Sequence, residues 1–204
     1  MYKKQLEKFF AENKITDKIP SAQAIAHFMM RMSATPETDI GLRNVIDTVM
    51  QEQSPERFAE ADPGKAEIAA ATTPADIIRL MRREVDTLNR PALIDKAMEM
   101  EAAIVPDVVR RLKTNLSDGF IETAAQFLAR STMDFAEEII GYFDEMHNPY
   151  AQSILLVLLG FKADEKHIPW LIEQHDKLKK LHPDENYCQG AHYALAETEG
   201  RFYA

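Results

Sequence analysis

Cys188 and His192 are the residue pair in this sequence with the clearest capacity for chemistry. They are four residues apart, so they share one face if the segment is helical. A cysteine beside a histidine can act as a nucleophile when the site is polar, partly exposed and oriented by a third group. In the repeat that runs through this part of the chain, however, Cys188 takes the same position as Ile121 and Ala151, which are core-type residues. We therefore expect a buried structural cysteine.

Two similar segments place an acidic residue three positions before a histidine. They are Asp144-Glu145-Met146-His147 and Asp164-Glu165-Lys166-His167. Carboxylate–histidine metal sites on helices use this spacing. A predicted helix of about 15 Å separates the two segments, so we expect them at opposite edges of the protein, where they cannot share one ion. We interpret both as surface charge at helix ends, and we expect neither a metal nor a cofactor.

One predicted helix combines an acidic side with an apolar side. Its acidic residues, called the acidic strip below, are Asp134, Glu137, Glu138, Asp144 and Glu145. Neither Lys nor Arg occurs from residue 131 to residue 161. The simple interpretation is a solvated face that promotes solubility. The sharper interpretation is a docking strip for a basic partner.

Helix-breaking residues punctuate the last two thirds of the chain about every 30 residues, which is the signature of a helical repeat. The clearest copy begins at Asn148-Pro149, continues through the apolar run Ile154–Leu159 and ends at Gly160. Because a single helical pair cannot bury its apolar faces, stacked pairs must share a continuous core. The sequence therefore predicts about four helical pairs over residues 73–204.

The residues before this array predict three further helices. Their expected apolar faces are Leu6, Phe9 and Phe10; then Ala24, Ile25, Phe28, Met29 and Met32; then Ile40, Val45, Ile46 and Val49. Residues 53–72 lose this pattern and contain Asp62-Pro63-Gly64. We expect residues 1–52 to form a helical N-terminal cap or subdomain, residues 53–72 to form a connector, and residues 73–204 to form the repeat array.

The segment from Pro149-Tyr150-Ala151-Gln152 to Leu159-Gly160, followed by Ile168-Pro169-Trp170-Leu171-Ile172, resembles a short HEAT-like (armadillo-type) helical repeat. In that family a polar turn opens the second helix, which ends in Leu-Gly, and the next unit begins with Ile-Pro-x-Leu. The resemblance covers about residues 73–200. It implies an all-α fold, a right-handed α-α superhelix or solenoid of about four helical pairs with a helical N-terminal cap, and binding mostly to proteins.

In this family the second helices line the concave face of the superhelix. The residues that the resemblance places on or near that face are Glu122, Tyr150, Gln152, Tyr187, Gln189 and His192. Exposed tyrosines often anchor interfaces. Glu122, Gln152 and Gln189 stand where the family carries arginine, so the chain is a divergent member and its partners cannot be borrowed from better-matched relatives.

Charge and composition exclude several classes of function. The formal net charge of −9 disfavours nucleic acid as a partner, because phosphate binding needs clustered Lys and Arg. The longest apolar run, Ile154–Leu159, is far below the ~20 residues of a membrane helix, so we expect no membrane association. Cys188 is the only cysteine, which is compatible with a reducing compartment, and we expect a cytoplasmic location.

These features favour a protein-interaction scaffold or adaptor that binds a partner protein through the concave face of the array. Two alternatives stay open. One is a small-ligand-binding protein or enzyme with a pocket near Cys188 and His192. The other is a structural oligomerisation module in which one end of the solenoid packs against another copy. The sequence identifies neither the partner nor the biological process.

Overall fold

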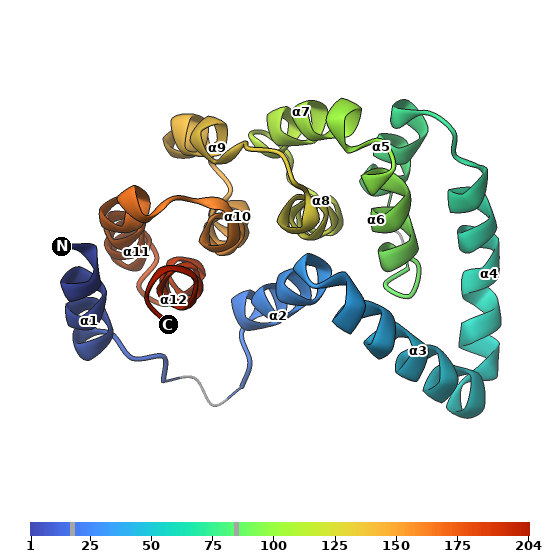
Figure 1. Cartoon of the computed structure of the whole chain (residues 1–204), viewed down its shortest axis with the longest axis horizontal. Coiled ribbons are helices and arrows are strands. Elements are labelled where there is room, and N and C mark those ends of the chain that lie inside the picture. Colours follow the sequence, from blue (N-terminus) through green and yellow to red (C-terminus); the bar gives the residue numbers. More distant parts are fainter. Residues whose placement is uncertain (17–18, 84–85) are drawn as a thin grey trace. The chain divides into compact units, whose positions relative to one another are not determined.

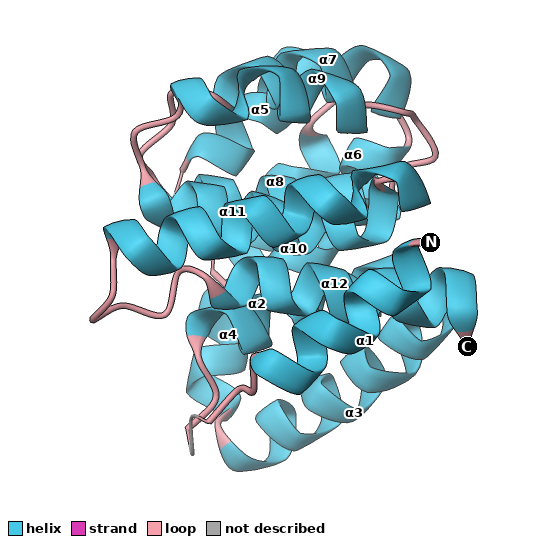
Figure 2. Ribbon diagram, turned by 90° about the vertical axis from the view of Figure 1, so that its left-hand side faces the viewer, coloured by secondary structure: helices cyan, strands magenta, loops and turns pink. Residues whose placement is uncertain are grey.

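The computed structural model describes residues 1–16, 19–83 and 86–204, except for the side chain of residue 62. Within these ranges the chain forms helices joined by loops and contains no strand (Figure 1, Figure 2). The predicted all-α class is therefore confirmed. The helices are α1 (Tyr2–Glu12), α2 (Ala22–Ala34), α3 (Pro36–Gln53), α4 (Pro55–Ala70), α5 (Pro74–Arg82), α6 (Arg90–Met98), α7 (Glu101–Leu112), α8 (Asp118–Arg130), α9 (Ala136–Tyr142), η1 (Phe143–Glu145), α10 (Pro149–Lys162), η2 (Glu165–His167), α11 (Ile168–Leu181) and α12 (Gln189–Tyr203).

The helices belong to two compact units that alternate along the sequence. The C-terminal unit consists of residues 1–29, 112–116 and 134–204, and the central unit consists of residues 30–111 and 117–133. Neither unit begins or ends at residue 52 or 72, the boundaries expected from the sequence. Segments far apart in the sequence therefore share a core within each unit.

The core of the C-terminal unit is the close pair of helices α10 and α12. All side chains of the run Ile154–Leu159 are buried. Ser153, early in α10, lies against Gly190, and Gly160, late in α10, lies against the backbone of Ala194. These contacts advance in the same direction along both helices, so α10 and α12 are parallel. A Cβ atom on Gly160 would lie 2.6 Å from the Cα of Ala194, so this approach requires glycine.

Helix α1 packs against α11 and α12 in the same unit. Its side chains Leu6 and Phe9, three residues apart on one face, are 0% and 3% exposed. Figures 1 and 2 both show α1 alongside α12. This burial agrees with the apolar face predicted for the first helix. Only the structure shows that the face meets α11 and α12, far later in the chain.

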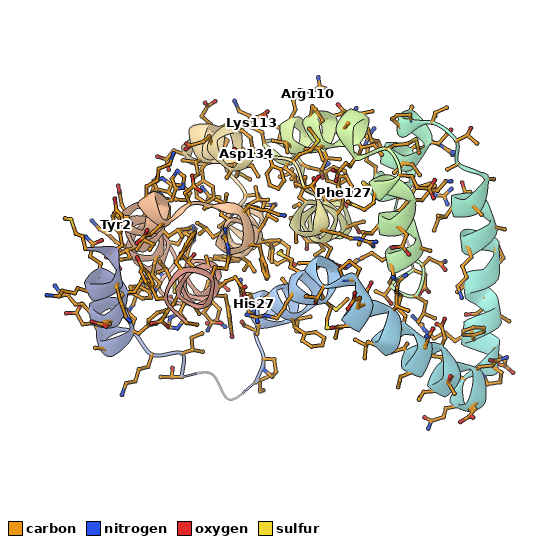
Figure 3. All side chains as sticks on the ribbon, in the orientation of Figure 1. Tyr2, His27, Arg110, Lys113, Phe127 and Asp134 are labelled. Carbon is orange, nitrogen blue, oxygen red and sulfur yellow. The ribbon has the colours of Figure 1, made fainter. Side chains whose placement is uncertain are left out.

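The central unit is built on the mutual packing of α5, α6 and α8. These helices bury large apolar side chains that include Leu80, Leu93 and Phe127, the last of which is labelled on α8 in Figure 3. Helix α4 packs against α6, and α3 packs against α4. The α3–α4 hairpin thus joins the unit mainly through its second helix.

Helix α4 covers most of residues 53–72, where the sequence pattern fades and where we expected a connector. Pro55 at the first helical position has a φ that suits a helix start, and the residues that follow are rich in the helix formers Ala and Glu. Pro63 lies inside the helix. Beside it, Nδ2 of Asn89 donates a hydrogen bond of 3.0 Å to the carbonyl of Ala61, and Gly64 leaves room for the Asn89 side chain. This contact from another segment helps to hold a helix that the local pattern alone did not predict.

Candidate functional site

The residues expected to face a concave surface are divided between the two units. Glu122 lies on α8 of the central unit, where its Oε2 is 2.9 Å from Nη1 of Arg90. The other five, Tyr150, Gln152, Tyr187, Gln189 and His192, belong to the C-terminal unit. Glu122 therefore has a local ionic partner on α6, and any common site can be described only for the other five.

Tyr150 and Gln152 lie in the first turn of α10. The side chain of Asn148 caps this helix, because its Oδ1 accepts hydrogen bonds from the N–H groups of Tyr150 and Ala151. Nε2 of Gln152 donates a hydrogen bond of 3.3 Å to the carbonyl of Phe143. Both Tyr150 and Gln152 are half-buried. Gln152 thus bridges two neighbouring elements of its own unit.

Helix α12 begins later than the sequence pattern predicts. The Cys188–His192 spacing was interpreted as part of one helix, but the first residue of α12 is Gln189, and turns precede it. Cys188 therefore lies at the N-cap and is half-buried, so the expectation of a buried core cysteine is wrong. Gln189, with 8% of its surface exposed, is buried instead.

A cleft of about 610 Å³ opens beside these residues in the C-terminal unit. It lies among the end of α1, α11 and the start of α12. The lining side chains with polar or reactive groups include His175, Lys179, Cys188, Gln189 and His192. The cleft brings together three of the residues that the sequence singled out and adds His175 and Lys179. Only the spacing of Cys188 and His192 signalled this site in advance.

Two histidines of this cleft, the buried His175 and the half-buried His192, are held in the neutral form. Burial and, as a smaller effect, the nearby imidazole of His175 together lower the pKa of His192 to about 4. Burial also lowers the pKa of His175, although Asp176 opposes this with a hydrogen bond of 3.0 Å to Nδ1. At neutral pH both rings offer neutral donors and acceptors, and they bring no positive charge to the cleft.

The acidic strip is exposed, but much of its charge is paired. All five side chains lie on the surface, with Asp134 before α9, two residues in α9 and two in η1. Lys166 lies 2.6 Å from Glu137, Lys177 lies 2.5 Å from Asp144, and Lys113 lies 2.6 Å from Glu145. The three lysines come from outside residues 131–161. The absence of Lys and Arg from that range therefore does not leave the acidic strip without nearby positive charge.

The two Asp-Glu-x-His segments have separate local roles. Asp144 pairs with Lys177, whereas Asp164 and His167 form a reciprocal capping box at the start of η2. The N–H of Asp164 donates to Nδ1 of His167, so Nε2 carries the proton and donates to Glu137, 3.1 Å away. Among the side chains that the structure describes, no three His, Cys, Asp or Glu residues are grouped to hold a metal ion.

The strongest feature that the sequence did not reveal is the orientation of α3. We expected Ile40, Val45, Ile46 and Val49 to face a core, yet they are exposed by 52%, 60%, 40% and 42% of their surface. No residue of α3 is buried. The inward side of the helix carries half-buried residues that include Asp39, Leu42 and Arg43.

Arg43 makes the ionic contact between the inward side of α3 and the rest of the central unit. Its Nη1 lies 2.7 Å from Oδ2 of Asp95 on α6, and its Nη2 lies 2.8 Å from Asp39, one turn earlier on α3. Val45 is two residues after Arg43, about 200° around the helix, and so on the opposite side. The Asp39–Arg43 spacing was the only sequence signal for this arrangement. Many ion pairs on exposed helix surfaces have the same four-residue spacing, so the signal is weak.

No helix in the described part of the chain has the length and apolar character needed to cross a membrane. Comparison with protein families, with curated proteins and with solved structures finds no match to this chain. The similarity to short HEAT-like repeats accordingly stays a prediction from the sequence.

Proposed function

We propose that this protein is an interaction module for another protein and that the outward apolar side of α3 is its principal docking surface. This surface, called the α3 face, consists of Val45, Ile46 and Val49. Its exposure is the observation that carries the proposal, because contiguous exposed apolar side chains mark interaction sites on globular proteins. The predicted concave-face residues are weaker candidates, since Glu122 and Gln152 already have partners within the chain.

The charges around the α3 face favour a basic partner. Helix α3 carries four acidic residues, Glu37, Asp39, Asp47 and Glu52, and a single basic residue, Arg43. Arg43 is engaged by Asp39 and Asp95, so it does not neutralise the rest of the helix. Complementary charge at the rim of an apolar patch accelerates association and selects among partners. A partner with an apolar centre and a lysine- or arginine-rich rim fits this surface.

Substitution of the α3 face tests this proposal. Val45→Lys/Val49→Lys removes two apolar side chains that are already exposed, so the thermal unfolding of the chain should change little. The matched control is Asn44→Lys/Gln51→Lys, which adds the same two positive charges at exposed positions of the same helix away from the face. In capture from an extract of its own cells, a protein bound by the wild type and by this control should be lost with Val45→Lys/Val49→Lys. Equal capture by all three chains contradicts the proposal.

Light scattering separates this function from the structural alternative. If the wild type associates with itself and Val45→Lys/Val49→Lys is monomeric, the α3 face joins copies of this chain, and the protein is an oligomerisation module. A wild type that stays monomeric while it binds a different protein supports the adaptor function.

The cleft beside Cys188 favours a second candidate, a small-ligand-binding protein. A volume of about 610 Å³ is within the range of sites for small molecules, and the cleft contains a thiol, an amine and two neutral imidazoles. The reaction of Cys188 with a thiol reagent tests access to this cleft. A rate near that of the urea-unfolded chain supports an open site. A thiol that reacts only after unfolding excludes Cys188 from a ligand site.

A further inference from the structure

Helix α1 occupies a groove formed by α11 and α12. Leu6 and Phe9 are its buried anchors, and Phe10 follows Phe9 at the edge. The Phe9 ring meets His175 edge-on, with ring centroids 4.8 Å apart, and the Phe10 ring lies 5.2 Å from His192. An amphipathic helix that inserts anchors at i, i+3 and i+4 into a groove is a recurrent mode of protein recognition. Here a segment of the same chain makes the contact.

The fit of α1 in this groove is incomplete. Cavities of about 350 Å³ and 610 Å³ lie along the helix, the first beside Gln5 and Phe9 and the second at its C-terminal end. Within the described part of the chain, the buried Oε1 of Gln5 has no hydrogen-bond partner. A buried polar atom left without a partner weakens the docked state. The two clefts leave room beside the helix, and an apolar side chain at the position of Gln5 would dock without this cost.

Helix α2 has contacts with α12 that do not involve α1. Helix α1 ends at Glu12, and α2 begins at Ala22. The first part of α2 is held separately, because Nε2 of His27, which is labelled in Figure 3, lies 3.0 Å from Oε2 of Glu197 on α12. The His27 ring also stacks on Tyr193. An isolated helix as short as α1 is marginal in water, so an undocked α1 loses its helical structure.

We propose that the α11–α12 groove is a helix-binding site that α1 covers in the absence of a partner. Its ligand is an amphipathic helix of another protein, with leucine and aromatic anchors in the positions of Leu6, Phe9 and Phe10 and an apolar residue in place of Gln5. A second copy of this chain is a poorer occupant. The α1 of a second copy offers the same contacts as the resident α1. The resident α1 is joined to the groove by its own chain, so its effective concentration is higher and it outcompetes the second copy. This site is distinct from the α3 face and does not depend on the function proposed for it.

Competition with the resident helix tests the proposal on the full-length chain. The probe is a fluorescent synthetic peptide of residues 1–16 that carries Gln5→Leu, with binding followed by fluorescence polarisation. The receptor with an emptied groove is the full chain bearing Leu6→Ala/Phe9→Ala. The peptide should bind this receptor at least tenfold more tightly than it binds the wild type, because α1 competes in the wild type. A peptide that also carries Phe9→Ala should not bind.

Two results overturn the proposal. One is the absence of peptide binding to a Leu6→Ala/Phe9→Ala chain that keeps its helical circular dichroism. The other is equal binding to that chain and to the wild type, which places the peptide elsewhere. If the peptide instead dissociates a wild-type dimer seen by light scattering, the natural occupant is a second copy, and the assignment to another protein is wrong.

Hydrogen exchange keeps the proposal testable if the double variant fails to fold. In the wild type, the amides of α1 should exchange at least tenfold faster than those of α10. Gln5→Leu should slow the exchange of α1, whereas Lys4→Ala, at an exposed position of the same helix, should not. An α1 as protected as α10, or one unaffected by Gln5→Leu, contradicts a displaceable helix.

Discussion

Gly190, at the start of α12, lies directly against the main-chain carbonyl of Ser153 on α10. A Cβ atom at position 190 would overlap this oxygen, and the Oγ of Ser153 donates a hydrogen bond of 2.6 Å to the carbonyl of Tyr187 nearby. The closest approach of the two core helices of the C-terminal unit therefore depends on the absence of one methyl group.

Gly190→Ala should destabilise the protein by about 1–3 kcal/mol, the usual cost of overpacking a tight contact. Gly200→Ala is the matched control in the same helix, because a Cβ there meets nothing within 4 Å. It should be neutral or stabilise the protein by up to about 1 kcal/mol, since alanine favours the helix. Urea unfolding followed by circular dichroism measures both. A Gly190→Ala chain as stable as Gly200→Ala would show that α12 can shift away from α10 without cost.

Because the pKa values of His175 and His192 are lowered, we predict that the free energy of unfolding decreases as the pH falls. The pKa of His192 is about 4 in the folded chain, below its ordinary value of 6.5, and the pKa of His175 is also lowered. The unfolded chain therefore takes up protons that the folded chain excludes. The stability contributed by the neutral imidazoles is complete above about pH 6.5 and is lost as the pH falls toward 4.

Urea unfolding at pH 7 and at pH 5 measures this loss. His192→Gln should make stability less dependent on pH in this window, whereas His147→Gln, at an exposed position, should leave the wild-type dependence unchanged. A wild type that is equally stable at pH 7 and pH 5 would contradict the lowered pKa values of these two histidines.

Asp95 on α6 pairs with an arginine of α3 and with an arginine of α8 within the central unit. Arg43 approaches it from α3 at 2.7 Å, and Arg130 forms a second ion pair from α8. Burial alone would raise the pKa of Asp95, but the hydrogen bonds from the two guanidinium groups outweigh it and lower the pKa. Asp95→Asn should cost about 1 kcal/mol, because it leaves two partly buried arginines without their shared carboxylate.

The release of α3 gives a second readout for the same substitution. Hydrogen exchange of α3 should accelerate in Asp95→Asn more than that of α5 or α8, since α3 buries no side chain of its own. Asp107→Asn is the control, because among the residues that the structure describes Asp107 pairs within its own helix, with Arg110 and Arg111. It should cost less than about 0.5 kcal/mol. If α3 stays as protected as before, its contact with α4 alone is sufficient.

Asn148 is predicted to be a stabilising cap. Its side chain accepts hydrogen bonds of 3.0 Å and 3.2 Å from the first N–H groups of α10. Asn148→Ala should cost about 1 kcal/mol in thermal or urea unfolding. Ser54→Ala, at the N-cap of α4, should cost less, because the Ser54 side chain makes no capping hydrogen bond. Equal losses would show that these caps act through backbone conformation and not through side-chain bonding.

The sequence predicted where helices form better than it predicted which helices pack against each other, and the reason is physical. Proline and asparagine mark helix starts through local geometry, so the start of α10 at Asn148-Pro149 and the burial of Ile154–Leu159 were foreseeable. Periodicity shows that a helix has an apolar side, but it does not say whether a partner covers that side. For α3 the inward contact includes the ion pair between Arg43 and Asp95, which are 52 residues apart and which no local pattern connects.

The candidate site was predicted only in part, for a similar reason. Cys188 and His192 attracted attention through their spacing, and the structure places both at one cleft. The start of α12 at Gln189 moved Cys188 from the expected core to the edge of that cleft. The role of Phe9 against His175 could not be read from the sequence, because nothing local links the first helix to α11.

The docking of α1 has a consequence for the order of events during synthesis. Asn13 and Lys179, which meet at the end of the groove, are 166 positions apart. At about 5–20 residues per second, a ribosome needs on the order of ten to thirty seconds to make the intervening chain. Throughout that interval Leu6 and Phe9 have no groove to enter and stay open to chaperones and to neighbouring nascent chains. Apolar anchors that emerge with the first helix are thus among the last to be buried.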